Sequence, residues 1–130
     1  MSSNKYKVLV VQGLHEQGLE ILKQRSDIEF KVLFSDDEKE ILEAAKDVNG
    51  ITVRTAQITE KIINSSKNLQ VISRHGVGYD SINLKSLNNK KIPLTIAAHS
   101  NMISVSEQAM FFLLALNKNV FYYDDFTRKG

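Results

Sequence analysis

The sequence predicts an α/β protein in which helices cover both faces of a five-stranded parallel sheet. Two observations support this fold class. Apolar runs rich in β-branched residues alternate with segments of helical periodicity, and no internal repeat or long linker interrupts them. At 130 residues the chain has the length of one domain. The pattern favours a flavodoxin-like sheet with strand order 2-1-3-4-5, whose ligands bind at the carboxyl ends of the strands.

Five segments have the composition of strands. The first, 8–11, contains no polar residue and should be buried on both faces, whereas the second, 28–34, alternates at its start and suits an edge. The other strands are expected at 51–53, 69–73 and 92–96. Because Pro93 has no backbone N–H, the last strand should be paired on one side only at that point.

Helical periodicity follows each of the first four strands. Leucines recur at helical spacing over about 14–24, and a second helix should bury Ile41, Leu42 and Ala45. A helix capped by Thr59 and a short helix over 84–88 complete the set. Two segments have the capping-box pattern, in which a hydroxyl and a carboxylate satisfy backbone donors at a helix start. These segments are Ser35-Asp36-Asp37-Glu38 and Ser104-Val105-Ser106-Glu107.

The last expected helix, over 104–119, is apolar on every face, and a basic polar tail follows it. Its longest apolar run, 109–116, is too short to cross a bilayer, so we expect no membrane partner. A helix of this kind must be covered all round, and one small sheet covers only one side. We therefore expect a further domain or a twin subunit to pack on it, giving a homodimer. An ordinary core helix is the alternative.

Composition excludes several classes of function. Seventeen Lys and Arg residues against fifteen Asp and Glu leave a net charge of +2, and the basic residues are scattered, so no nucleic-acid partner is expected. The chain has no cysteine, which excludes disulfides and thiolate chemistry and is compatible with the cytoplasm. Three histidines, His15, His75 and His99, show no metal-ligand spacing, so no metal site is expected.

A glycine-containing loop, Gly76-Val77-Gly78-Tyr79-Asp80-Ser81, follows the fourth strand. It lacks the third glycine of the dinucleotide fingerprint and the acidic residue about 20 positions later, so we predict no dinucleotide site there. Two glycines nevertheless let backbone N–H groups approach a ligand closely, and successive N–H groups can bind an anion. Asp80 should orient the loop by accepting backbone donors. The alternative is a tight turn between strand and helix.

Arg54 and Arg74 end the third and fourth strands, which are neighbours in the expected sheet. Both guanidinium groups should then lie at one rim, where they can bind a carboxylate or a phosphate. The alternative for each is a surface arginine with a local acidic partner. Asn101 precedes the last helix, and its amide offers a donor and an acceptor to a bound oxygen.

In these segments the chain resembles the amino-terminal, substrate-binding part of the D-isomer-specific 2-hydroxyacid dehydrogenases, a family that includes D-3-phosphoglycerate dehydrogenase. The resemblance covers about 8–120 and rests on several motifs in the same order, namely Val53-Arg54-Thr55, 69–84, 91–94 and 100–107. It implies that the N–H groups of Val77 and Gly78 bind the substrate carboxylate. It also implies that Arg54 and Asn101 contact the substrate and that Arg74 recognises a phosphate.

The resemblance further implies NAD as the cofactor and hydride transfer at C2 of a small 2-hydroxy or 2-oxo acid. The catalytic Arg, Glu and His of the family match no residue here, so we expect no catalytic residue in this chain. We expect a substrate-binding domain over 1–101, and a linker helix and tail over 102–130 that lead to an absent nucleotide-binding domain. This part alone should be an inactive, truncated piece of a phosphoglycerate-dehydrogenase-like enzyme.

The chain departs from the family pattern at two places. Ile96-Ala97-Ala98-His99-Ser100 stands where an Asn-Ala-Pro stretch is frequent, and Gln108 occupies a position that is often histidine. The hydroxyacid therefore stays open. A stand-alone anion-binding or dimerisation module without catalysis is the alternative function. A phosphoacceptor signalling domain is disfavoured because it needs carboxylates where Gln12 and Arg54 stand.

Overall fold

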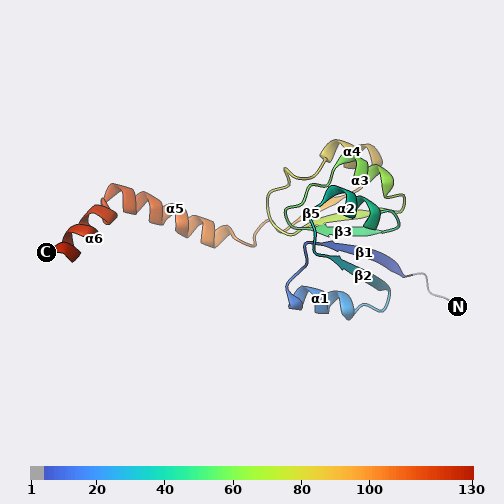
Figure 1. The fold of residues 1–130 in the computed structure, drawn as a ribbon, viewed down its shortest axis with the longest axis horizontal. Helices are drawn as coiled ribbons and strands as arrows, with labels where there is room; N and C mark the ends of the chain where they lie inside the picture. Colours follow the sequence, from blue (N-terminus) through green and yellow to red (C-terminus); the bar gives the residue numbers. More distant parts are fainter. Residues whose placement is uncertain (1–4) are drawn as a thin grey trace. The chain divides into compact units, whose positions relative to one another are not determined.

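The computed structural model describes residues 5–130, which divide between Ala97 and Ala98 into two units. In the described part of the first unit, five strands alternate with four helices (Figure 1). They are β1 (Tyr6–Val11), α1 (Glu16–Lys23), β2 (Ile28–Leu33), α2 (Glu38–Ala44), β3 (Gly50–Val53), α3 (Glu60–Ser65), β4 (Val71–Arg74), α4 (Leu84–Lys90) and β5 (Leu94–Ile96). The second unit contains α5 (Met102–Asn117) and α6 (Val120–Lys129).

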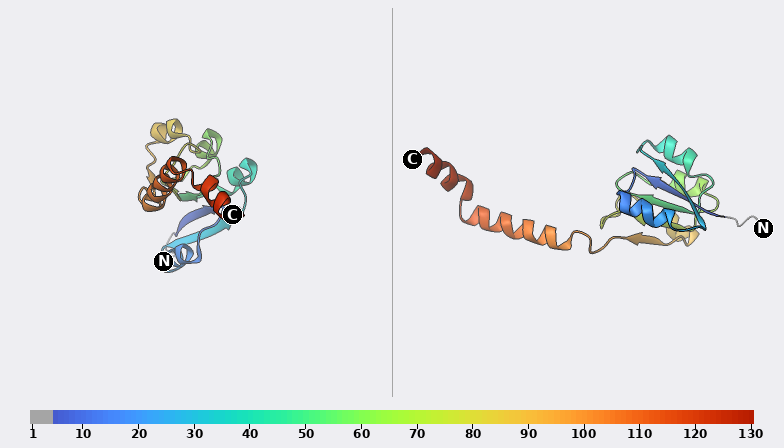
Figure 2. Two further views of the ribbon diagram at one scale, coloured as in Figure 1. Left: turned by 90° about the vertical axis from the view of Figure 1, so that its left-hand side faces the viewer. Right: turned by 90° about the horizontal axis from the view of Figure 1, so that it is seen from below.

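The sheet confirms the predicted topology. Its strands are all parallel and lie in the order β2-β1-β3-β4-β5. Strands β2 and β5 form the edges, which confirms the edge position predicted for the last strand. Strand β5 begins at Leu94, two residues later than the predicted start at residue 92, so Pro93 precedes the strand instead of lying within it. Helices α2, α3 and α4 lie on one face and α1 lies on the other (Figure 1 and Figure 2).

The core lies between the sheet and the three helices that share a face. Leu9, Ile51 and Ile72 occupy one row across β1, β3 and β4 and are at most 2% exposed. From the helices, Ile41 and Ile63 are fully buried against this row. Full burial of such a side chain contributes about 1.5–3 kcal/mol. By contrast, α1 has no fully buried residue, so most apolar burial in the first unit is on one face.

The start of α2 differs from the prediction. The helix begins at Glu38, and the Asp37 carboxylate accepts from the backbone N–H groups of Lys39 and Glu40 at 2.9 and 3.1 Å. The predicted capping box from Ser35 is therefore wrong by two residues, because a charged carboxylate beside the helix start is a stronger acceptor than a hydroxyl. The Ser35 hydroxyl instead accepts from the N–H of Asp37 at 3.1 Å.

Thr59 precedes α3 at the predicted position, but its side chain does not cap that helix. Its hydroxyl donates to the Glu38 carboxylate at 2.7 Å. Glu38 is thus engaged with α3 and not with its own helix start. The side chains that the sequence assigned to two local caps instead join α2 to α3 through one side-chain bond.

In the second unit the predicted capping box is also wrong. Helix α5 begins at Met102, so Ser104 lies inside it, and the Ser106 hydroxyl donates to the Met102 carbonyl at 2.8 Å. Asn101 occupies the N-cap position without a side-chain cap bond. The helix starts earlier because nothing in 102–103 opposes helical geometry, and an interior hydroxyl can bond the carbonyl four residues back.

The predicted polar tail is helical. After a left-handed residue, Asn119 with φ 49°, α6 runs from Val120 to Lys129. Two ion pairs at i,i+4 spacing support it, Asp124–Arg128 at 3.0 Å and Asp125–Lys129 at 2.8 Å. The acid-before-base spacing of these pairs is present in the sequence, where it favours a helix.

Helix α5 exposes most of its apolar side chains within its unit. Ala115 is its one buried residue in the described chain. Its large apolar side chains are each more than half exposed; they are Met102, Ile103, Val105, Met110, Phe111, Phe112, Leu113, Leu114 and Leu116. Among the residues the structure describes, no helix combines the length and apolarity needed to traverse a bilayer.

Candidate anion-binding site

The carboxyl ends of β3 and β4 bring Arg54 and Arg74 to one rim. Val53, the last residue of β3, pairs in register with Arg74, the last residue of β4. The pairing continues one step further, because the His75 N–H donates to the Val53 carbonyl at 2.7 Å. The backbones of the two arginines therefore lie on neighbouring strands at the same edge, as the sequence predicted.

Arg74 folds back over its own loop. Its Nη1 donates to the His75 carbonyl at 3.0 Å, and its Nε is buried with no hydrogen-bond partner in the described chain. A Cβ added to Gly76 would lie 1.3 Å from Nη1, and Gly76 has φ 145°. The backbone conformation therefore favours glycine at this position, and a larger residue would also force the Arg74 guanidinium to move.

The next two residues present free backbone donors. Within 5–130, the N–H groups of Val77 and Gly78 donate no hydrogen bond, and both residues are exposed. The loop is held on either side of them. The Gly76 carbonyl accepts from the Ala97 N–H at 3.0 Å, and the Ser81 carbonyl accepts from the Ile58 N–H at 2.8 Å. Two successive donors on an anchored loop are suited to an anion.

Asp80 does not orient this loop as predicted. In the described chain its carboxylate accepts no hydrogen bond, and the residue is exposed. Backbone bonds from Ile58 and Ala97 anchor the loop instead. The sequence did not reveal these partners, because they lie about 20 positions away on other elements.

Arg54 has a free guanidinium. The residue is exposed, and in the described part of the chain it forms neither an ion pair nor a side-chain hydrogen bond. The alternative of a local acidic partner is therefore not what the structure shows. An unpaired arginine at this rim is available to an anionic ligand.

Sequence reasoning missed the contribution of Gln12. This residue follows β1, and its Oε1 accepts from the N–H groups of Thr55 and Ala56 at 2.7 and 2.8 Å. Its Nε2 lies 3.0 Å from the Thr55 hydroxyl. The sequence shows only a polar residue after an apolar strand, which is also what an ordinary loop residue looks like.

The remaining predicted polar residues have separate locations. Asn101 belongs to the second unit, where it precedes α5 and is exposed; its contact with substrate stays a prediction. His15 caps α1, since its Nδ1 accepts from the Gln17 N–H at 3.4 Å. His75 and His99 are exposed, one in each unit.

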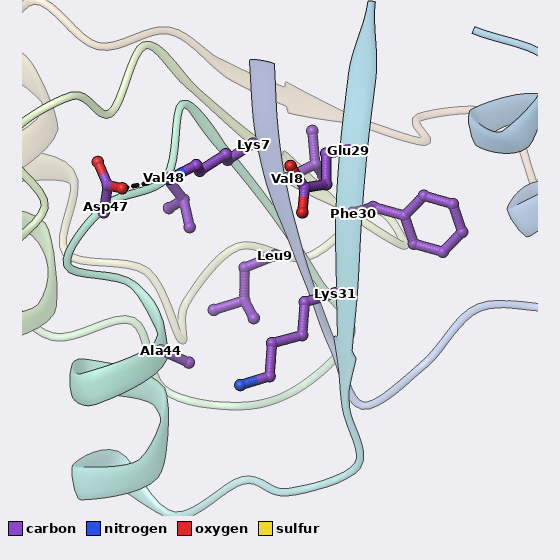
Figure 3. Close-up of a pocket in the computed structure, with 9 residues that line it drawn as sticks. All are labelled: Lys7, Val8, Leu9, Glu29, Phe30, Lys31, Ala44, Asp47 and Val48. Atoms are coloured by element: carbon purple, nitrogen blue, oxygen red, sulfur yellow. Dashed lines mark hydrogen bonds and ion pairs between the residues drawn. The ribbon is translucent and has the colours of Figure 1, made fainter. Parts of the chain in front are cut away.

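A hollow of about 240 Å³ lies away from this rim, between the β1–β2 pair and the end of α2 (Figure 3). Lys7 donates to Asp47 at its margin, and this ammonium lowers the pKa of the Asp47 carboxyl. No residue of the candidate site lines the hollow. Its polar groups connect β1 to the end of α2, which is a structural role.

The order of the parallel sheet places this domain in the flavodoxin-like class, and an anchored loop with two free N–H groups lies at the carboxyl ends of its strands. Residues 8–127 match the D-isomer specific 2-hydroxyacid dehydrogenase catalytic domain, and the chain belongs to this family. This confirms the resemblance seen in the sequence.

Individual proteins with similar sequences or structures support this family assignment. The chain is 34% identical over 115 residues to D-3-phosphoglycerate dehydrogenase of Methanocaldococcus jannaschii, an alignment that covers 88% of this chain and 22% of that protein. The PH0520 protein of Pyrococcus horikoshii OT3 superposes with a TM-score of 0.83 at 28% identity, over 97% of this chain and 38% of that one.

A structure of NAD⁺-bound 3-phosphoglycerate dehydrogenase from Entamoeba histolytica superposes with a TM-score of 0.73 at 25% identity, over 85% of this chain and 39% of that one. The chain spans about a fifth to two fifths of the length of its curated relatives.

Proposed function

We propose that this chain binds the carboxylate of a small 2-hydroxy or 2-oxo acid and supplies the substrate-binding part of an NAD-dependent dehydrogenase acting on the CH–OH group of D-2-hydroxyacids. The observation that carries the proposal is the pair of unused N–H groups at Val77 and Gly78. These two neutral donors can bind a carboxylate but carry no positive charge. Arg54, which follows the neighbouring strand β3, supplies the positive charge.

A phosphorylated substrate of the 3-phosphoglycerate kind is favoured. Arg54 has no partner in the described chain, so binding a phosphate would break no existing ion pair. Arg74 is at the same loop, and turning its side chain toward a ligand would break one hydrogen bond in the described chain, from Nη1 to the His75 carbonyl, and would give its unpaired Nε an acceptor. The names of relatives such as the Methanocaldococcus jannaschii protein point to the same substrate. Asn101 would add an amide donor and acceptor to the bound acid.

NAD is the cofactor that the family relationship implies, and it would accept or deliver the hydride when bound. The NAD⁺-bound relative from Entamoeba histolytica supports this choice. The family's catalytic Arg, Glu and His have no match among the residues of this chain, so residues 1–101 would bind and orient the acid while residues 102–130 lead to the nucleotide-binding part. The chain alone is expected to be inactive, and it would act in the cytoplasm.

We also propose that α5 mediates a homodimer through 104–119. Its large apolar side chains, such as Phe112 and Leu113, are more than half exposed within their unit. A large exposed patch of apolar side chains usually marks an interface. Sedimentation of the purified chain should show a dimer whose population rises with concentration. A monomer throughout the accessible concentration range would contradict the proposal.

Isothermal titration of the chain with D-3-phosphoglycerate and with D-lactate tests the binding function. Both acids should bind, and the phosphorylated acid should bind more tightly. Arg54→Gln should weaken phosphoglycerate binding about 10- to 100-fold, because a charge-assisted hydrogen bond contributes about 1.5–3 kcal/mol.

The matched control is Lys67→Gln, which removes an exposed positive charge. Lys67 precedes β4 and so lies near the amino ends of the strands, away from the candidate site. Binding should not change in this variant. Failure of both acids to bind at millimolar concentration would refute the function. Formation of NADH by the chain alone would refute its proposed inactivity.

A further inference from the structure

Gln12 connects two loops at the carboxyl edge of the sheet. A single carboxamide oxygen receives two successive backbone donors, from Thr55 at 2.7 Å and from Ala56 at 2.8 Å. The nitrogen of the same amide is 3.0 Å from the Thr55 hydroxyl. Gln12 and Thr55 are 43 positions apart, so this contact joins the loop after β1 to the loop after β3.

The contact bears directly on Arg54. On one side of Arg54, Val53 is fixed in the sheet, since it pairs with Val11 of β1 and with Arg74 of β4. On the other side, the Thr55 N–H is fixed by Gln12. The Arg54 side chain itself has no bond to the described chain, so the backbone on either side sets the direction in which it leaves the rim.

Gln12 is itself held in one conformation. It is half-buried and has φ 66°, in the left-handed region that glutamine seldom adopts, and its N–H donates to the Leu33 carbonyl of β2 at 2.7 Å. Gly13 follows it with φ 75°. A backbone held in an uncommon conformation at a ligand rim is typical of residues whose side chain must point in a defined direction.

We propose that Gln12 is a positioning residue that aims Arg54 at the substrate anion. The inference depends on the proposed anion-binding function. The amide suits this task because it accepts and donates without carrying a charge. A glutamate here would accept from the same N–H groups but would place a negative charge beside Arg54 and compete with the substrate for it. A methionine would fill the space and accept neither N–H effectively.

Three variants of the 130-residue chain test the inference by titration with D-3-phosphoglycerate. Gln12→Met should weaken binding about tenfold, an effect of about 1.4 kcal/mol. Gln12→Glu should weaken binding as well, and added salt should reduce its deficit relative to the unmodified chain. Thr55→Val removes only the hydroxyl contact and should weaken binding two- to threefold; it serves as the second variant should Gln12→Met fail to fold. Gln70→Met, at an exposed glutamine beside the amino end of β4, is the matched control and should bind normally.

A double-mutant cycle with Arg54→Gln separates positioning from a general structural role. If Gln12 acts through Arg54, Gln12→Met should have little further effect once Arg54 is removed. Equal effects of Gln12→Met in the presence and absence of Arg54 would overturn the inference. Normal binding by Gln12→Glu at low salt would also count against it.

A ligand-free readout distinguishes this inference from the proposed function. In Gln12→Met the N–H groups of Thr55 and Ala56 should exchange with solvent faster, and the backbone order parameter of Arg54 should fall, with both unchanged in Gln70→Met. An unaltered Arg54 order parameter would overturn the positioning role even if the chain binds no acid. Absence of acid binding together with a lowered Arg54 order parameter would instead refute the proposed function and leave Gln12 as the residue that positions Arg54.

Discussion

The two units of the chain differ in how far they bury apolar side chains. In the first unit, alternate residues of the central strands, such as Ile51 and Ile72, are at most 2% exposed because α2, α3 and α4 cover them. In the second unit, α5 is at least as apolar, yet Leu113 is 60% exposed and Ala115 is its one buried residue in the described chain. A complete core therefore needs elements from several parts of the chain, which α5 lacks within its unit.

One substitution in each unit should give the largest difference in the free energy of unfolding. Ile72→Ala empties a fully buried site in β4 and should lower the free energy of unfolding by about 2–5 kcal/mol. Leu113→Ala in α5 should change it by less than about 0.5 kcal/mol at concentrations where the chain is monomeric. Urea denaturation followed by circular dichroism measures both values.

Equal destabilisation by Ile72→Ala and Leu113→Ala would contradict the contrast between a covered sheet and an uncovered helix. A concentration-dependent effect confined to Leu113→Ala would sharpen it, because that result would locate α5 in the dimer contact.

Substitution of two glycines in the loop after β4 should give the next largest difference in unfolding free energy. Gly76→Ala combines a φ of 145° with a Cβ that would displace the Arg74 guanidinium, so we expect a loss of about 1–3 kcal/mol in unfolding free energy. Gly78→Ala is the control, because the nearest atom to its Cβ is Asp80 Oδ2 at 3.7 Å, and it should change stability by less than about 0.5 kcal/mol. A neutral Gly76→Ala would show that the loop relaxes freely.

Substitutions in the two predicted capping boxes should give a smaller difference in stability. Asp37→Ala removes two bonds at the start of α2 and should cost about 1 kcal/mol. Ser104→Ala lies inside α5 and should be neutral or slightly stabilising, since alanine has the higher helix propensity. Thermal unfolding of both variants measures the difference. A loss in Ser104→Ala as large as that in Asp37→Ala would restore the cap that the sequence suggested.

The smallest effect is electrostatic. In the first unit Lys7 and Asp47 connect β1 to the end of α2, whereas the pairs of α6 are internal to one helix. Hydrogen bonds from Lys7 and then Asn68 lower the pKa of Asp47, so its contribution to stability is present above the ordinary value of 3.8 and is lost as the pH falls through the lowered pKa. Asp47 in turn raises the pKa of Lys7, so that contribution is present below 10.5 and is lost as the pH rises through the raised pKa.

Asp47→Asn should therefore be slightly less stable than the unmodified chain at neutral pH and equally stable once the pH is well below 3.8. Thermal midpoints measured across this range test the sign. A difference that grows with acidity would contradict it. The effect should be small because both side chains are at least half exposed.

Much of the fold was predictable because it depends on local patterns. The apolar run at 8–11, the prediction of an edge strand near Pro93 and the alternation of strands with helices led to the observed sheet order. Local patterns did not identify which polar side chain caps a helix. Asp37, and not Ser35, caps α2, and the Thr59 hydroxyl donates to Glu38 of another helix. These partners depend on the distances between side chains in the folded chain, which a local pattern does not contain.

The candidate site was predictable to the same extent. The ends of neighbouring strands placed Arg54 and Arg74 at one rim, since strand order alone decides this. The folding of Arg74 over Gly76 and the contact of Gln12 with Thr55 depend on side-chain geometry and loop conformation. Neither leaves a periodic signal in the sequence.

The central claim is that the free N–H groups of Val77 and Gly78 bind the substrate carboxylate. Titration of the ¹⁵N-labelled chain with D-3-phosphoglycerate, observed amide by amide in ¹H–¹⁵N spectra, tests it most directly. The account predicts saturable downfield proton shifts at these two amides, larger than at any amide of α1 or α4. Saturable binding that leaves both amides unshifted would contradict it.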